Sequence, residues 1–425
     1  MLYHLFEWFN EMNIKLPGSA LFQFITSRVL LAVILSLIIS ALFGKKLINL
    51  LRRKQVGESV RELGLVGEMQ KKGTPTMGGI IIIMAIIVPT VLLADLSKAY
   101  IRLMIFSTLW LGLIGFIDDY LKLRAKRLAG AEGKQYKKGD KDGLAGWFKV
   151  SGQVVLGIVV AATLLFNENT RAWREYLGEV KQGDSTIKKI TLDGKTTYFV
   201  EANEPITTIP FVKDHEFRYS KLLPAAMHGL TWILYTLVII FIITAVSNGA
   251  NITDGLDGLA TGVSAIIGVC LGIFAYASGN LRLAEYLNIM YIPNLGELSI
   301  FIGAMIGACV GFLWYNTFPA QVFMGDTGSL MLGGIIAALA IIVRKELLIP
   351  IFCGVFLVEN LSVMLQVGYF KYTKRKYGEG RRIFLMSPLH HHYQKLGYHE
   401  SKISTRFWIV TIICVVFSIV TLKIR

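Results

Sequence analysis

Charged side chains are scarce in this sequence. Of its 425 residues, 17% are charged and 54% are hydrophobic, whereas an average soluble domain carries roughly 25% charged residues. Apolar runs of about 17 to 25 residues recur along almost the whole chain, and each is long enough to cross a hydrocarbon core of about 30 Å as a helix. This balance excludes an ordinary soluble domain. It predicts an all-α polytopic membrane protein that forms one domain over residues 1–425.

The apolar runs predict about ten transmembrane helices. The first run follows a Trp-bearing segment and has no small-residue cleavage site, so we expect a retained span and not a signal peptide. The ten runs lie near 22–44, 77–94, 100–117, 147–166, 229–247, 259–278, 299–315, 329–343, 347–368 and 406–423.

Cysteine is rare, and the spacing of the cysteines argues against a thiolate metal site. The four cysteines lie inside apolar runs and have no metal-ligand spacing, so they are predicted to be packing residues. They are Cys270, Cys309, Cys353 and Cys414.

The distribution of Lys and Arg predicts the orientation of the chain. Segments 45–76, 118–146 and 369–404 carry eight basic residues each, whereas 95–99 and 279–298 carry one each. Basic residues mark the cytoplasmic side, so these three loops are predicted to face the cytoplasm and both termini the periplasm of a bacterial inner membrane. The formal charge of +15 is interleaved with apolar runs, which favours anionic lipid and anionic substrate over nucleic acid as partners.

Residues 167–228, between the fourth and fifth runs, are predicted to be a periplasmic insertion. The segment contains nine basic and nine acidic residues. Residues 190–192 and 197–200 favour β-structure and flank Asp193 and Gly194, a short-turn signal, so we expect a small β-hairpin. A tolerated embellishment is favoured over a partner-docking role.

Ionisable residues at the ends of apolar runs are candidate functional groups, because they are costly there unless they face water, protein or an ion. Asp118 and Asp119 end the third run, with Lys122 one turn later. Adjacent carboxylates point in different directions on a helix, so one can face a reacting centre while the other meets a metal or Lys122. An ordinary polar helix end is the alternative.

Two further carboxylates, Asp254 and Asp257, lie in a Gly-rich bend after the fifth run, close to Asn248 and Asn251. If the bend is helical, their three-residue spacing places both on one face. Such a set suits a Mg²⁺ site or hydrogen bonds to sugar and phosphate. A polar loop that caps two helices is the alternative.

The segment 316–329 leads into the eighth run. Its small residues from Gly325 onward predict free backbone N–H groups at a helix start, which suit a diphosphate. Asp326 is then placed to hold a Mg²⁺ that bridges phosphate oxygens. Phe323 offers a face for base stacking, although an aromatic residue here is more often an interface anchor.

Three cationic or polar features complete the candidate groups. Lys71 and Lys72 beside a Thr/Gly turn predict a diphosphate clamp, with an ordinary positive-inside flank as the alternative. The histidines 390–392 lack a partner at zinc-ligand spacing, so phosphate contact or shaping of the site is favoured. Glu359, in the middle of the ninth run, either supports a lipid-binding cleft or braces helices.

All these clusters fall on the predicted cytoplasmic side and supply the parts of a phosphoryl-transfer site. The chain resembles the polyprenyl-phosphate N-acetylhexosamine-1-phosphate transferase superfamily in DDYLK at 118–122, NITDGLDGL at 251–259 and FPAQVFMGDTGSL at 318–330. GTPTMGG at 73–79 and SPLHHHY at 387–393 resemble its muramoyl-pentapeptide branch. The resemblance covers nearly the whole chain apart from the insertion.

The resemblance implies transfer of phospho-MurNAc-pentapeptide from UDP-MurNAc-pentapeptide to undecaprenyl phosphate, which forms lipid I and releases UMP in peptidoglycan synthesis. It implies Mg²⁺ as cofactor, Asp326 as its ligand with Asp254 as a candidate second ligand, and Asp118 as acceptor of a proton from the lipid phosphate. The other implied site residues are catalytic Asp119, Asp257, His390, His391 and His392, and substrate-binding Lys71, Lys72, Thr76, Lys122, Asn248, Asn251, Asn316, Phe323 and Gly325.

Several alternatives stay open. Direct attack of the lipid phosphate on the β-phosphate is favoured over a phospho-enzyme on an acid such as Asp326, because a carboxylate that binds Mg²⁺ is a poorer nucleophile. A sister enzyme that uses UDP-GlcNAc, or an ion-coupled transporter, would explain the same composition, although a transporter's site lies at mid-membrane. The sequence does not decide whether the protein forms a homodimer.

Overall fold

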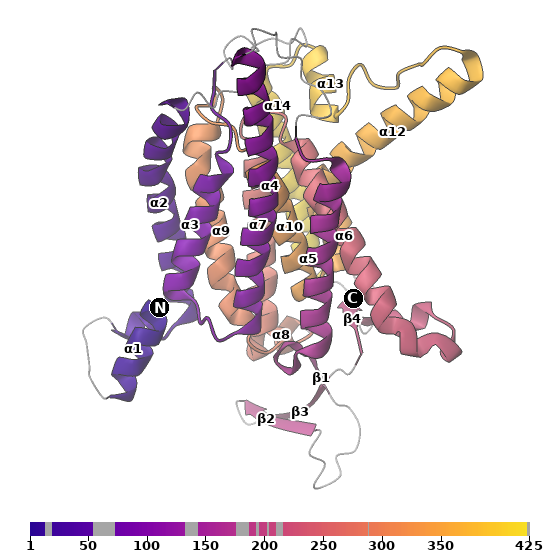
Figure 1. Cartoon of the computed structure of the whole chain (residues 1–425). Helices are drawn as coiled ribbons and strands as arrows, with labels where there is room; N and C mark the ends of the chain where they lie inside the picture. Colours follow the sequence, from indigo (N-terminus) through magenta and orange to yellow (C-terminus); the bar gives the residue numbers. More distant parts are fainter. Residues whose placement is uncertain are drawn as a thin grey trace.

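The computed structural model describes residues 1–12, 19–53, 73–131, 143–175, 187–192, 195–201, 204–209, 216–287 and 289–422. Most of its long helices run side by side in one bundle (Figure 1). The α-helices are α1 (Leu2–Glu11), α2 (Ile25–Arg53), α3 (Gly79–Leu93), α4 (Ala99–Ala131), α5 (Gly146–Phe166), α6 (Thr231–Thr253), α7 (Leu259–Gly279), α8 (Leu281–Leu287), α9 (Leu298–Asn316), α10 (Gly325–Ile342), α11 (Ile349–Phe352), α12 (Gly354–Tyr377), α13 (Leu389–Lys395) and α14 (Glu400–Val420).

Each of the ten predicted runs coincides with a helical segment, but two of them are not straight, full-length spans. Among the described residues, eight helices are long and apolar enough to cross a membrane. Helix α3 has 15 residues and at 1.5 Å per residue falls short of a hydrocarbon core of about 30 Å. The ninth run is wrong as a straight span, because the chain bends by 78° between α11 and α12, at Cys353.

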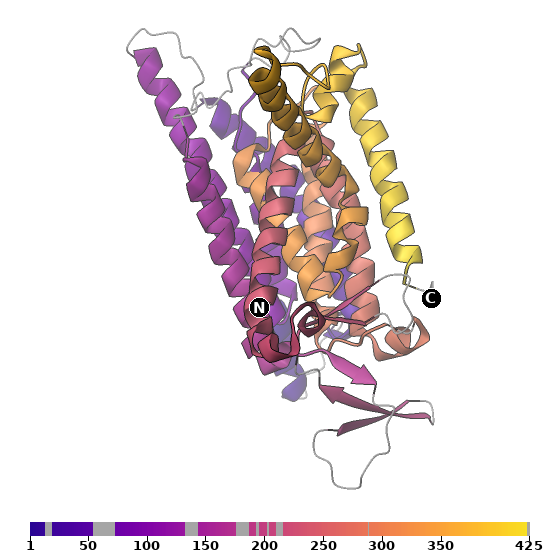
Figure 2. The same ribbon diagram turned by 90° about the vertical axis from the view of Figure 1, so that its right-hand side faces the viewer.

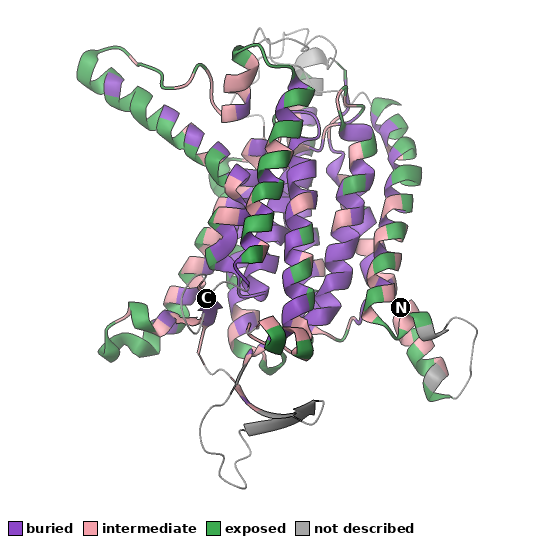
Figure 3. Ribbon diagram, turned by 180° about the vertical axis from the view of Figure 1, so that it is seen from behind, coloured by how far each residue is buried: buried purple, intermediate pink, exposed green. Residues whose placement is uncertain are grey.

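Helix α10 forms the centre of the bundle. Every residue from Thr327 to Ile342 is buried, and Figure 3 shows the buried residues gathered in the middle helices. A helix that is apolar on all sides needs apolar neighbours on all sides, and α10 packs against α3, α4, α5, α6 and α7. Asp326 lies in the first turn of α10 and is therefore held at one end of the buried core.

The outer helices turn apolar side chains away from the bundle. On α2, Leu30, Ile34, Ile38 and Leu42 recur every fourth residue and are 64%, 53%, 47% and 64% exposed. This spacing places them on one face of the helix. A long exposed apolar stripe is unfavourable in water but is satisfied by lipid, so the chain is a multi-pass membrane protein.

The insertion lies at the end of the bundle that also carries both termini, here called the hairpin end (Figures 1 and 2). Strands β2 (Ile187–Leu192) and β3 (Lys195–Glu201) pair antiparallel, with Leu192 opposite Lys195. This confirms the predicted hairpin, whose turn residues 193–194 lie outside the described part. Strand β1 (Trp173–Glu175) extends the sheet, and β4 (Ile206–Thr208) pairs with β5 (Glu216–Arg218); neither feature was predicted.

The described cysteines are all free thiols. Three of them are buried and Cys414 is partly buried. They therefore contribute to packing.

Candidate active site

Three carboxylates meet at the end of the bundle opposite the hairpin end, here called the carboxylate end. Asp118 and Asp119 lie on α4, and Asp326 lies in the first turn of α10. One oxygen of each lies within 4.8 Å of the others. Asp118 is fully buried and Asp119 is 4% exposed, so their charges require nearby cations or donors.

Two ammonium groups occupy the space between Asp118 and Asp326. The Nζ atom of Lys122 lies 2.6 Å from Asp118 Oδ2 and 3.0 Å from Asp326 Oδ2. The Nζ atom of Lys149, near the start of α5, lies 2.8 Å and 2.5 Å from the same two oxygens. Sequence reasoning missed Lys149. The rule that marked Asp118, an ionisable residue near the end of an apolar run, applies to Lys149 equally well.

Asp119 has a different task, because its carboxylate caps α10. Its Oδ1 accepts a hydrogen bond from the Asp326 N–H at 3.2 Å, and its Oδ2 accepts from the Thr327 N–H at 2.9 Å and the Thr327 hydroxyl at 2.7 Å. Amides in the first helical turn have no partner within the helix. The prediction that this helix start is free for a diphosphate is therefore wrong for these two amides.

Replacing Asp119 with Asn is expected to lower the thermal stability of the protein. A side-chain amide has one acceptor oxygen and turns its NH₂ group toward the remaining donors, and loss of a buried hydrogen bond to a charged group costs about 2 kcal/mol. Thermal unfolding in detergent, with the exposed Glu379→Gln as the control, measures this. An unchanged unfolding temperature in Asp119→Asn would contradict the capping role.

Gly325 allows the loop before α10 to approach the carboxylates. Its φ is +72°, and a Cβ there would lie 2.6 Å from Asp119 Oδ2 and 2.9 Å from the hydroxyl oxygen of Thr76. Only glycine suits both this backbone conformation and this space. Thr76 therefore lies beside the carboxylates, whereas Lys71 and Lys72, before it, lie outside the described residues.

The loops at 73–79 and 318–324 pair through their backbones. The Phe323 N–H donates to the Pro75 carbonyl at 2.8 Å, the Gly78 N–H donates to the Phe323 carbonyl at 2.8 Å, and the Gly79 N–H donates to the Met324 carbonyl at 2.9 Å. Two motifs far apart in sequence thus form one wall of the site. The stacking role of the half-buried Phe323 stays a prediction.

Of the predicted asparagines, Asn251 joins the centre. Its Nδ2 donates to Asp326 Oδ1 at 2.9 Å and to Ser329 Oγ at 2.8 Å. Asn248 lies one turn earlier on α6, and its Nδ2 donates to Gln153 Oε1 of α5 at 3.0 Å. Asn248 therefore joins α6 to α5, and within the described part of the chain it forms no hydrogen bond with the three carboxylates.

The side-chain amide of Asn316 forms hydrogen bonds with other residues of the protein. Its Oδ1 accepts from the Gly258 N–H and the Thr261 hydroxyl, both at 3.1 Å, and its Nδ2 donates to the Val322 carbonyl at 2.9 Å. The amide thus fixes the loop before α10 against α7. Its predicted contact with the nucleotide stays a prediction.

The bend 254–258 is a turn and not a helix, because α6 ends at Thr253. The helical spacing considered for Asp254 and Asp257 is therefore not realised. The Oδ2 atom of Asp257 accepts from the Ala320 N–H at 2.9 Å, and its N–H donates to Glu400 Oε1 at 2.6 Å. Among the described residues, neither aspartate belongs to the three-carboxylate group.

The three histidines turn to different partners. Buried His390 donates its backbone N–H to Glu359 Oε1 at 3.2 Å, and its Nδ1 lies 3.0 Å from Glu359 Oε2. The Nδ1 atoms of His391 and His392 bond to Gln394 and to the Leu385 N–H. This arrangement favours Glu359 as a brace between α12 and α13.

These features define a multi-pass membrane protein with a centre of carboxylates and lysines at one end of its helix bundle. A model of the glycosyl transferase family 4 matches residues 190–344, and a phospho-N-acetylmuramoyl-pentapeptide-transferase signature matches residues 71–83.

Curated relatives match over the full length of both chains. The chain is 56% identical over 428 residues to the phospho-N-acetylmuramoyl-pentapeptide-transferase of Flavobacterium psychrophilum, and 56% identical over 431 residues to that of Flavobacterium johnsoniae. It is 54% identical over 427 residues to that of Amoebophilus asiaticus, and each match covers 100% of both proteins. The chain belongs to the phospho-N-acetylmuramoyl-pentapeptide-transferase family.

Proposed function

We propose that this protein transfers phospho-MurNAc-pentapeptide from UDP-MurNAc-pentapeptide to undecaprenyl phosphate, forming lipid I and releasing UMP in peptidoglycan synthesis. The observation that carries the chemistry is the pairing of Asp118 and Asp326 through Lys122 and Lys149. Such a centre offers oxygen ligands and cations side by side, as phosphoryl transfer requires. The basic loops support a cytoplasmic position for the carboxylate end in the bacterial inner membrane, where a soluble nucleotide-linked donor is met.

The donor set fits Mg²⁺, which prefers oxygen ligands. Both oxygens of Asp119 accept from donors that are fixed to the first turn of α10. Oδ2 of Asp118 and Oδ2 of Asp326 instead face lysine side chains, which are flexible enough to move aside, so Asp326 and Asp118 are the residues that would hold the ion. The grouping of Asp118 and Asp326 supports Asp118 over Asp254 as the second ligand. Bound Mg²⁺ would neutralise charge on the diphosphate and on the departing UMP.

The reaction is a displacement at the β-phosphorus of the donor. An oxygen of undecaprenyl phosphate forms the new P–O bond, and the bond from the β-phosphorus to the oxygen bridging to UMP breaks and leaves its electron pair on UMP. A phosphate monoester with a second pKa of about 6 is mostly dianionic at neutral pH, so the acceptor needs no base.

The contacts of Asp118 favour direct attack without proton transfer to this residue. Its Oδ1 accepts from the Leu144 N–H at 2.7 Å, and its Oδ2 pairs with Lys122 and Lys149. A carboxylate with these partners orients the two ammonium groups. The lysine side chains are 36% and 19% exposed, so both can also bond to phosphate oxygens that enter the site.

Purified protein is expected to release UMP only when UDP-MurNAc-pentapeptide, undecaprenyl phosphate and Mg²⁺ are all present. Turnover of UDP-GlcNAc in place of this donor would assign the chain to the sister transferases. If neither donor leads to UMP release, the ion-coupled transporter becomes the favoured hypothesis. Exchange of labelled UMP into the donor without lipid acceptor would overturn direct attack in favour of a phospho-enzyme.

A further inference from the structure

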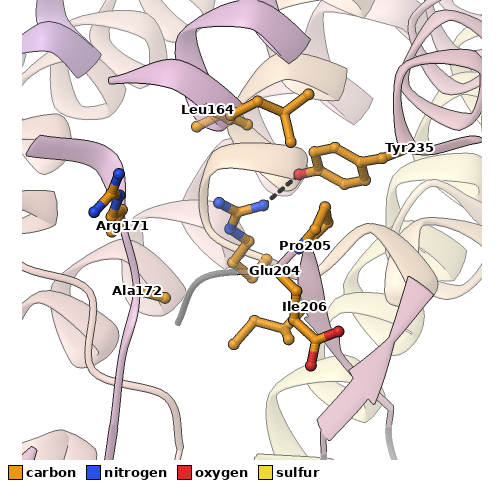
Figure 4. Close-up of a pocket in the computed structure, with 9 residues that line it drawn as sticks. Leu164, Arg171, Ala172, Glu204, Pro205, Ile206 and Tyr235 are labelled. Atoms are coloured by element: carbon orange, nitrogen blue, oxygen red, sulfur yellow. Dashed lines mark hydrogen bonds between the residues drawn. The ribbon is translucent and has the colours of Figure 1, made fainter. Parts of the chain in front are cut away.

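A cavity of about 290 Å³ lies at the hairpin end, between the end of α5, the insertion and the residues that follow α10 (Figure 4). Leu164 and Leu165, at the end of α5, and Ile206 of β4 line it with apolar side chains. Arg171 and Arg344 also line it. The cavity therefore combines apolar walls with cationic groups, and the insertion forms part of its wall.

Arg344 is the unusual group in this cavity. It is 5% exposed, its Nη1 donates to the Tyr235 hydroxyl (dashed in Figure 4), and its guanidinium lies 5.7 Å from the centre of the Tyr235 ring. It forms no ion pair with any carboxylate in the part of the chain that the structure describes. A guanidinium stays protonated in proteins, and a buried charge is costly unless it is paired. Its described counter-charge is the buried carboxylate of Glu346, which acts on it without an ion-pair contact, and an anion in the cavity would give the guanidinium a direct partner.

Two acids lie in this region, Glu204, which lines the cavity, and the buried Glu346. Glu204 Oε2 accepts from the Ser220 hydroxyl at 2.7 Å, and Glu204 Oε1 lies 3.3 Å from Arg218 Nη1. Figure 4 shows the Glu204 carboxylate turned away from the Tyr235 hydroxyl. Glu346 Oε1 accepts from the Tyr219 hydroxyl at 2.9 Å.

The neighbouring Lys345 adds a second buried cation to this charge balance. Its Nζ donates to the Thr208 hydroxyl at 3.0 Å, and burial lowers the pKa of Lys345 to about 8, against the opposing pull of Glu346. A lysine with this pKa is mostly protonated at neutral pH, so Arg344 and Lys345 together outweigh the single charge of Glu346. Arg344 is the one of these two cations that lines the cavity.

The backbone of Arg344 adds an independent observation. Its φ is +56°, its N–H donates to the Ile341 carbonyl at 3.0 Å, and the Lys345 N–H donates to the Ala340 carbonyl at 2.9 Å. This pattern is a Schellman motif, whose left-handed position usually holds glycine. An arginine is strained there, and strain at a ligand-lining residue is a reason to look for a function of its side chain.

We propose that this cavity binds the phosphate group of an amphipathic anion, with Arg344 as the buried charge partner and Arg171 as a second cation at the rim. Leu164, Leu165 and Ile206 would contact the apolar part of the ligand. Arg171 is suited to the rim because its side chain is 34% exposed and its nearest acid oxygen, on Glu201, lies at 3.4 Å. The insertion then serves to close a binding site and is more than an embellishment.

The test uses delipidated full-length protein in an uncharged detergent. Thermal unfolding and native mass spectrometry are followed with dihexanoylphosphatidylglycerol, with dihexanoylglycerol as the phosphate-free probe, and with inorganic phosphate. Loss of one charge-assisted hydrogen-bonding partner is expected to weaken binding about 10- to 100-fold in Arg344→Gln, and Arg171→Gln is expected to weaken it less. Arg102→Gln removes an exposed arginine on α4 and serves as the matched control.

Arg344→Gly guards against a folding artefact, because glycine suits the left-handed backbone. We expect this variant to unfold cooperatively yet to lose the stabilisation by phosphatidylglycerol. Competition by inorganic phosphate would identify free phosphate as a ligand, and binding of the lipid alone would identify a headgroup. No binding by the wild type, equal binding by the Arg344 variants, or equal binding of dihexanoylglycerol would overturn the proposal. Since transfer activity is not measured, failure here leaves the proposed reaction untouched.

Discussion

Asp326→Asn abolishes most of the transfer activity, with UMP release lower by at least about 100-fold. The substitution keeps the shape of the side chain and an oxygen that can accept from Asn251, which now lies 2.9 Å from Asp326 Oδ1. It removes the charge that pairs with Lys122 and Lys149 and that would hold Mg²⁺. The rate falls because the negative charge on the diphosphate is no longer neutralised in the transition state by an ion held at Asp326.

The same substitution is expected to leave the fold intact. Both lysines keep Asp118 as a partner, and Asp119 still caps α10 with its own carboxylate. Asp326→Asn should therefore unfold near the wild-type temperature, unlike Asp119→Asn. The assay measures UMP release over a Mg²⁺ titration beside Glu379→Gln. Activity of Asp326→Asn within a few-fold of wild type would reject Asp326 as the metal ligand.

The positions of the helices were largely predictable from hydropathy, because the length of an apolar run decides whether a helix can cross the membrane. The break at Cys353 was not, because residues 347–368 are apolar on both sides of it. Bending there lets α12 leave the bundle (Figure 1) while Glu359 still reaches His390 of α13. A run of apolar residues carries no signal for that geometry.

The candidate site was predictable as residue types but not as a set of contacts. Asp119 and Asp326 were both marked, yet nothing local indicates that one carboxylate caps the helix of the other. That contact depends on the close approach of α4 to α10 at Gly115, where a Cβ would collide with the Asp326 backbone. The packing of two helices that lie about two hundred residues apart in sequence therefore decides that Asp119 has a structural role, whereas Asp326 is available for chemistry.

Lys149 is the residue for which the structure adds most, and Lys149→Gln is expected to lower UMP release by about 100-fold. Its Nζ bonds to both Asp118 and Asp326, so its loss leaves Lys122 alone to balance three carboxylates and the incoming phosphates. Loss of a positive charge that stabilises the developing negative charge lowers kcat. Loss of a simple binding contact would instead raise KM and leave kcat unchanged.

Three further variants separate these roles. Lys149→Arg keeps the positive charge and is expected to recover part of kcat. Lys122→Gln should lower UMP release less than Lys149→Gln, because its side chain is more exposed, at 36% against 19%, and its contact with Asp326 is longer, at 3.0 Å against 2.5 Å. The exposed Lys371→Gln on α12 controls for charge alone. Wild-type kcat in Lys149→Gln would show that this lysine only holds two helices together, and the catalytic cation would then have to be Lys122.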